Sequence, residues 1–143
     1  MPTIKKIVCP LDFSEASKGA AAYAVDLARQ LGATVDFIHT YQLAGFASPT
    51  SELAADVAKE AQGELDTCIA ALHTAGVTVE RHLRLGVPYA EIVAAAIDGG
   101  AGLIVMGTTG RTGLEHFLLG SVAERVVQTS PVPVLTVKHQ PVR

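Results

Sequence analysis

Short runs of apolar residues alternate along the chain with longer segments whose apolar residues recur every three or four positions. Short runs of this kind are typical of buried strands, and the longer periodic segments are typical of amphipathic helices. The pattern predicts strands at residues 4–10, 34–40, 77–85, 103–106 and 132–137. It predicts helices at residues 15–31, 50–75, 88–98 and 121–129.

Residues that favour helix ends agree with this division. Ser14 can cap the first helix, and Gly32 can end it. Gly76 is expected to end the second helix, and Pro88 suits the first position of the third. The chain therefore reads as strands and helices in strict alternation.

Strands that alternate with helices imply a parallel sheet with helices on both faces. We therefore expect an α/β fold with an open five-stranded sheet, formed by a single domain over residues 1–143. Right-handed crossovers leave few strand orders. One of them, the flavodoxin-like order 3-2-1-4-5, places the first and fourth strands side by side. The alternating charges of residues 77–85 suit one edge of that sheet, and residues 132–137 would form the other.

Composition narrows the class of protein. Of the 143 residues, 49% are hydrophobic and 17% are charged, which indicates a globular domain. A net charge of −3 argues against a general nucleic-acid binder. No apolar run approaches the roughly 20 residues of a membrane span, and the N-terminus lacks a signal-peptide core. We expect a cytoplasmic protein that is not inserted in a membrane.

Metal-binding and disulfide patterns are not evident in the sequence. Cys9 and Cys68 lie in apparent apolar positions and are expected to be free thiols. The histidines are scattered, and neither a zinc-finger spacing nor an HExxH motif is present. No direct metal ligand is therefore predicted, apart from Asp12 if Mg²⁺ accompanies a phosphate ligand.

A glycine-rich stretch follows the predicted strand 103–106. It reads Gly107, Thr108, Thr109, Gly110, Arg111, Thr112 and Gly113. Glycines let successive backbone N–H groups form a concave positive nest, and Arg111 adds a charge that suits phosphate. Gly120 and Ser121 then start a helix, where free N–H groups also favour an anion. Glycines alone would fit an ordinary loop, but the combination indicates a polyphosphate site.

Asp12 follows the first strand and admits two interpretations. As an isolated residue it suits a turn at a helix entry. In open parallel sheets, however, ligands bind beyond the carboxyl ends of the strands, at the switch point. If the first and fourth strands are neighbours, Asp12 faces the glycine-rich loop.

The spacing Gly107-x2-Gly110-x9-Gly120-Ser121 resembles the nucleotide-binding signature of the universal stress protein family, in the subgroup that binds ATP. The surrounding GRTGLEHFLLGSVAERV, the opening IKKIVCPLDFSEAS and the closing SPVPVLTVK also resemble that family, so the resemblance covers essentially the whole chain. Two positions depart from the usual family text: Thr109 is often His, and His116 is often Arg.

The resemblance implies the strand order 3-2-1-4-5 and a site for ATP, together with Mg²⁺. Asp12 would lie near the sugar and the metal–phosphate side, and Pro10 and Thr40 would frame the base. Phosphates and ribose would contact the stretch Gly107 to Gly113 and the helix start, formed by Gly120, Ser121, Val122 and Ala123. The resemblance also implies a homodimer that pairs the last strand, Val132–Val137, with its symmetry mate.

The function expected is that of an ATP-binding regulator of the stress response, which acts through a protein partner that the sequence does not identify. A slow ATPase or a phosphotransferase in the same pocket is the alternative, although no catalytic residue is assigned because the loop offers no obvious general base. A partner-binding module with a vestigial pocket would not need the intact glycine spacing. AMP and cyclic nucleotides are not distinguished from ATP. Other nucleotide folds fit poorly, because the P-loop spacing GxxxxGK[ST] is absent.

Overall fold

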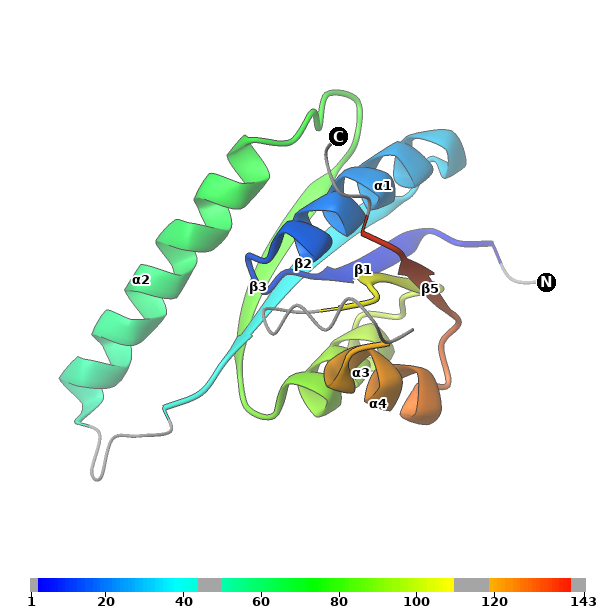
Figure 1. The fold of residues 1–143 in the computed structure, drawn as a ribbon. Helices are drawn as coiled ribbons and strands as arrows, with labels where there is room; N and C mark the ends of the chain where they lie inside the picture. Colours follow the sequence, from blue (N-terminus) through cyan, green and yellow to red (C-terminus); the bar gives the residue numbers. More distant parts are fainter. Residues whose placement is uncertain (1–2, 44–49, 110–118, 140–143) are drawn as a thin grey trace.

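A computed structural model describes residues 3–43, 50–109 and 119–139 of the chain. Its strands and helices alternate, as the hydrophobic pattern predicts (Figure 1). The strands are β1 (Lys6–Pro10), β2 (Thr34–Tyr41), β3 (Val79–Leu85), β4 (Leu103–Gly107) and β5 (Val134–Val137). The helices are α1 (Glu15–Leu31), α2 (Ser51–Ala70), α3 (Pro88–Asp98) and α4 (Ser121–Thr129).

The strands form one parallel sheet in the order β3-β2-β1-β4-β5, which confirms the predicted topology. In the centre of the sheet Ile7 of β1 lies between Val35 of β2 and Leu103 of β4. The carboxyl ends of β1 and β4 therefore point to the same edge of the sheet.

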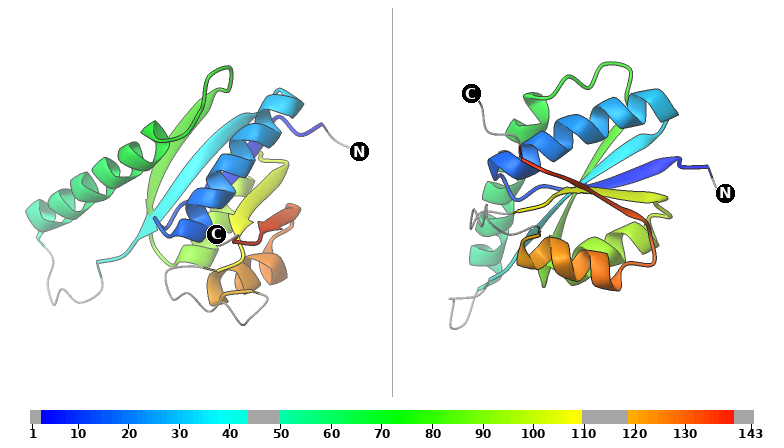
Figure 2. Two further views of the ribbon diagram at one scale, coloured as in Figure 1. Left: turned by 45° about the horizontal axis from the view of Figure 1, so that its top comes forward. Right: turned by 45° about the vertical axis from the view of Figure 1, so that its right-hand side comes forward.

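Two helices cover each face of the sheet. The apolar faces of α1 and α2 pack on one side, over a cluster that includes Phe37 and Val105. The helices α3 and α4 pack on the other side, over Val8 and Ile104 (Figure 2). Cys9 is fully buried in the first cluster, and this burial raises the pKa of its thiol well above the ordinary range.

Local hydrogen bonds explain most helix boundaries. The Ser14 side chain accepts a bond from the N–H of Ser17 and so caps α1, while Gly32 ends that helix with a φ of 67°. Thr50 caps α2 in the same way, through the N–H of Leu53. Pro88 occupies the start of α3. The roles of Ser14, Gly32 and Pro88 confirm the predictions from the sequence, whereas the Thr50 cap was not predicted, because Thr50 was placed inside the helix.

The helix α2 ends at Ala70, five residues before the predicted end at residue 75. The last turn of the helix tightens, because the N–H of Leu72 donates to the carbonyl of Ile69, three residues earlier. The Arg29 guanidinium of α1 donates to the backbone carbonyls of His73, at 2.7 Å, and Ala75, at 3.3 Å. These carbonyls are thus held by another helix. Within the described residues, no helix is both long and apolar enough to cross a membrane.

Three strands begin two residues later than predicted, and β3, which begins at Val79, is one of them. β1 begins at Lys6, and β5 begins at Val134. Before β5, the Ser130 hydroxyl accepts from the N–H of Val132 and donates to the Val132 carbonyl, so this residue is held in a turn. The pairing with β4 can therefore begin only after it.

Candidate nucleotide site

A cavity of about 320 Å³ lies at the carboxyl edge of the sheet, where β1 and β4 are neighbours. This is the switch point at which open parallel sheets bind ligands. The predicted site residues that line it are Pro10, Asp12, Thr40, Gly107, Thr109, Gly120, Ser121, Val122 and Ala123. The topology thus brings together residues from both ends of the sequence.

The remaining predicted residues do not line the cavity or cannot be placed. Thr108 is used through its backbone: its N–H donates to the carbonyl of Val137, and its carbonyl accepts from the N–H of Gly120. Thr108 therefore ties the end of β4 to β5 and to the start of α4. Gly110, Arg111, Thr112 and Gly113 lie outside the described residues.

The inner wall of the cavity is apolar. Leu11, Ile38, Ile92 and Met106 contribute to it from the ends of three strands and from α3, and all four are buried. None of the four was predicted as a site residue. Their position was the only signal: Leu11, Ile38 and Met106 each lie within three residues of a strand end that faces the site. An apolar wall suits the flat face of a base better than it suits a phosphate.

The polar side of the cavity is the start of α4. Its N-cap is Gly120, which supplies no side-chain hydrogen bond, whereas α1 and α2 are capped by hydroxyls. The first N–H groups of a helix have no partner within the helix, and the helix dipole makes this end positive. Ser121, Val122 and Ala123 carry those groups and line the cavity. This end of the cavity therefore suits an anion.

Asp12 combines the two roles that the sequence left open. Its Oδ1 accepts from the N–H of Ser14 at 2.9 Å and from the Ser14 hydroxyl, and its own N–H donates to Ser17 Oγ at 3.3 Å. These bonds shape the turn that leads into α1. Asp12 also lines the cavity, so the turn fixes a carboxylate beside the candidate ligand.

His39 also lines the cavity. It was not predicted as a site residue, because the histidines are scattered along the sequence and form no motif. Its Nδ1 lies 2.7 Å from the carbonyl oxygen of Leu11. Since a carbonyl can only accept, Nδ1 carries the hydrogen, and the bond fixes the ring beside Thr40. Phe13 stacks on that ring with the centroids 4.3 Å apart, and it does so with a φ of 68°, which is rare for a residue with a side chain.

The sequence is similar to known proteins along nearly its whole length. The sequence model of the universal stress protein family matches residues 3–138. The chain is 42% identical to universal stress protein MJ0531 of Methanocaldococcus jannaschii, over 94% of this chain and 82% of that relative. It is 31% identical to universal stress protein MJ0577 of the same organism, over 95% and 96% of the two chains.

Solved structures agree with these similarities. The structure of MJ0577 superposes with a TM-score of 0.81 at 31% identity and covers 99% of this chain and 100% of that one. The universal stress protein of Archaeoglobus fulgidus, solved in complex with dAMP, superposes with a TM-score of 0.68 at 26% identity. It covers 96% of this chain and 100% of that one.

Proposed function

Because the chain belongs to the universal stress protein family, we propose that its cavity binds ATP with Mg²⁺ and that it acts as a nucleotide-dependent regulator. The observation that carries the proposal is the two-sided character of the cavity. An apolar wall and an uncapped helix start lie on the same 320 Å³ space. A nucleotide has the matching character, with an apolar base at one end and phosphates at the other.

Different residues of the described cavity would contact different parts of the nucleotide. Pro10 and Thr40, at the ends of β1 and β2, would frame the base against the apolar wall. The N–H groups of Ser121 and its two successors would bind phosphate oxygens, as helix starts commonly do. Asp12 would lie toward the sugar or a Mg²⁺ ion, which keeps most of its own waters. Gly110 and Arg111 remain predictions from the sequence for the outer phosphates.

The dAMP complex of the Archaeoglobus fulgidus relative supports the class of ligand. It supports an adenine nucleotide and leaves the number of phosphates to be measured. The proposal of ATP rests on the sequence signature that continues from Gly107 through the loop. Mg²⁺ would neutralise part of the charge that several phosphates bring to a protein with a net charge of −3.

A slow ATPase is the second candidate. It would need a group to orient or deprotonate water, and Asp12 is the carboxylate that lines the described cavity. Its Oδ1 already accepts two hydrogen bonds from Ser14, which favours a positioning role over proton transfer. We therefore place regulation before catalysis in the proposal.

Mass spectrometry of the small molecules released on denaturation tests the class of ligand first. ATP in near-stoichiometric amount is expected, and it would favour a sensor that retains its nucleotide. ADP would instead favour the enzyme, and turnover would then be compared between the wild-type protein and Asp12→Asn. If nothing is released, titration with Mg-ATP and with AMP decides, and the absence of saturable binding to either would overturn the proposal.

A single substitution tests whether the start of α4 holds the phosphates. Ser121→Asp places a carboxylate at the first position of the helix, where it stabilises the helix but repels a phosphate. We expect the Kd for Mg-ATP to rise about tenfold or more, which corresponds to a loss of about 1.4 kcal/mol of binding free energy. The free energy of unfolding should stay unchanged or rise. Calorimetric titration measures the first quantity and urea denaturation the second.

Gln128→Glu is the matched control for Ser121→Asp. It makes the same change in net charge on the same helix, at an exposed position in the last turn. We expect it to leave the Kd for Mg-ATP nearly unchanged. Equal affinities in the wild type, the control and Ser121→Asp would show that phosphates are not bound at this helix start.

A further inference from the structure

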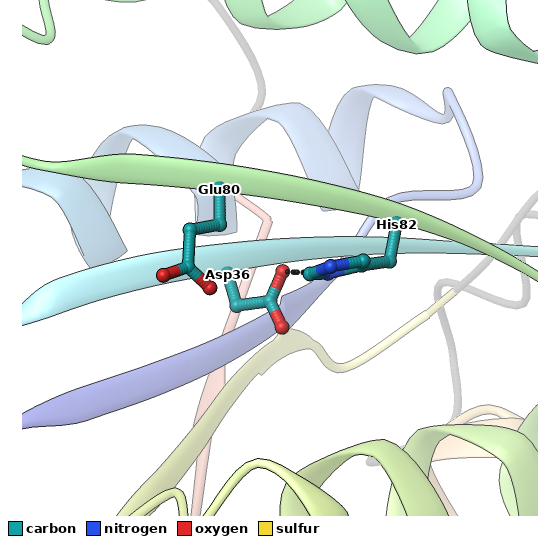
Figure 3. A group of neighbouring side chains, drawn as sticks. All are labelled: Asp36, Glu80 and His82. Atoms are coloured by element: carbon teal, nitrogen blue, oxygen red, sulfur yellow. Dashed lines mark hydrogen bonds and ion pairs between the residues drawn. The ribbon is translucent and has the colours of Figure 1, made fainter.

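A second group of polar side chains lies on the sheet face that α3 and α4 cover. It consists of Asp36 of β2 and Glu80 and His82 of β3, whose side chains converge (Figure 3). Asp36 pairs with Glu80 in the register of the two strands, and His82 follows two residues later, so all three lie on one face. One ligand atom of each lies within 4.8 Å of the others. We call these three residues the Asp–Glu–His cluster.

Asp36 is the feature of this cluster that most needs an explanation. It is only 5% exposed, and it is the one acidic or basic residue that is buried in the described part of the chain. A buried carboxylate is costly unless a cation or several hydrogen bonds compensate it. Its carboxylate Oδ1 lies 2.7 Å from His82 Nδ1, so it points into the cluster.

We propose that the Asp–Glu–His cluster binds a divalent transition-metal ion of the Zn²⁺ type. Two carboxylates and one imidazole form a donor set that suits Zn²⁺, whereas Mg²⁺ and Ca²⁺ prefer oxygen ligands alone. Three protein ligands leave a fourth position for water. A bound ion would also supply the positive charge that the buried Asp36 lacks when the imidazole is neutral.

The side chains need only a small adjustment to bind such an ion. Ligand distances of about 2.1 Å put the donors of a tetrahedral site about 3.4 Å apart. The outer two members can move, because the side chains of Glu80 and His82 are 42% and 56% exposed. Asp36, on the central part of β2, would stay in place as the anchor. His82 would exchange its bond to Asp36 for a bond to the ion.

Lys6 is the neighbour that opposes this proposal most directly. Its Nζ lies 3.3 Å from Glu80 Oε2, so it already pairs with one oxygen of the cluster. The other oxygen of Glu80 remains for the ion, and Lys6 would then hold the ligating carboxylate in orientation, as groups outside the metal ligands often do. The competing account is a set of ion pairs without any metal, and titration distinguishes the two.

The Asp–Glu–His cluster is separate from the candidate nucleotide site. None of its three residues lines the described cavity. The two sites are close, however, because Ile38 lines the cavity and pairs with His82 in the sheet. Metal binding to nucleotide-free protein therefore tests the cluster alone, whether or not the cavity binds ATP.

The experiment is calorimetric titration of Zn²⁺ into the full chain after removal of metals and nucleotide. We expect one saturable site per chain with micromolar or tighter affinity, and no comparable binding of Mg²⁺. His82→Ala should weaken Zn²⁺ at least about tenfold, and Glu80→Gln should also weaken it. Both residues have exposed side chains, so both variants should keep the fold, which circular dichroism checks.

His73→Ala is the control, because it removes an exposed histidine outside the cluster. It should bind Zn²⁺ as the wild type does. Co²⁺ gives an independent readout, since its visible spectrum should report nitrogen and oxygen ligands without a thiolate from Cys68. The proposal is overturned if the wild type shows no saturable site, if His82→Ala binds as tightly as His73→Ala, or if Co²⁺ reports thiolate.

Discussion

Gly107 shows how one residue can be conspicuous in a sequence for a reason other than the expected one. The glycine-rich stretch suggested backbone N–H groups turned toward an anion. Gly107 does line the cavity, but it is not among the glycines with positive φ. A Cβ at this position would lie 3.1 Å from the backbone carbon and oxygen of Ala16. The absence of a side chain thus lets the end of β4 pack against the first turn of α1.

Gly107→Ala should therefore destabilise the protein even without a ligand. The added methyl group meets backbone atoms, which cannot rotate away as the end of a flexible side chain can. We expect the free energy of unfolding to fall by about 1–3 kcal/mol, as for other overpacked sites. Urea denaturation of nucleotide-free protein measures this. An unchanged midpoint would mean that α1 shifts at little cost and that the packing is looser than the distances indicate.

Among the helices and strands, the boundaries that were predicted correctly are those that depend on local interactions. The Ser14 cap of α1, the Gly32 end of that helix and the Pro88 start of α3 were predicted because each depends on one residue and its nearest neighbours. The end of α2 was predicted wrongly, because Gly76 suits a helix end but the tight turn that ends the helix comes earlier, at Leu72.

The helix α2 also offers a prediction of its own. Gly63 lies exposed in its interior, and a Cβ there would have no described atom within 4 Å. Glycine in a helix interior costs about 0.5–1 kcal/mol relative to alanine. Gly63→Ala should therefore raise the free energy of unfolding by about that amount, measured by urea denaturation. A loss of stability would indicate that another chain packs closely on this face of α2.

For the whole molecule, the alternation of elements and the family resemblance were enough to predict the strand order and the place of the cavity. The alternation fixes a parallel sheet, and the order brings the ends of β1 and β4 together. The apolar wall and the Asp–Glu–His cluster were missed for a common reason. Leu11 and Ile92, which line one cavity, and Asp36 and His82, which are in contact, come together only through the sheet and its helices. No spacing along the chain marks them.

The same topology leaves β5 at an edge of the sheet, and we expect a homodimer through Val132–Val137. The carbonyls of Pro133 and Val137 bond to β4, so the backbone groups of the alternate residues Val134 and Thr136 face away from it. Thr136→Pro removes an outward N–H without removing a bond to β4. We expect the variant to sediment as a monomer at concentrations where the wild type is a dimer.

Thr136→Val is the control for this prediction, because it keeps the backbone N–H. It should sediment as the wild type does. Thermal unfolding followed by circular dichroism shows whether the proline variant is still folded. A wild-type protein that sediments as a monomer would contradict the prediction at once.

The cavity draws its walls from residues 10–12 near one end of the sequence and from residues 120–123 near the other. A ligand can therefore be held only after both ends have joined the sheet, and its binding free energy adds to the free energy of global unfolding. At a free concentration of 100 times its Kd, a ligand adds about 2.7 kcal/mol. The supply of nucleotide in a cell would then govern the lifetime of the protein, since chains without ligand would unfold and meet proteases more often.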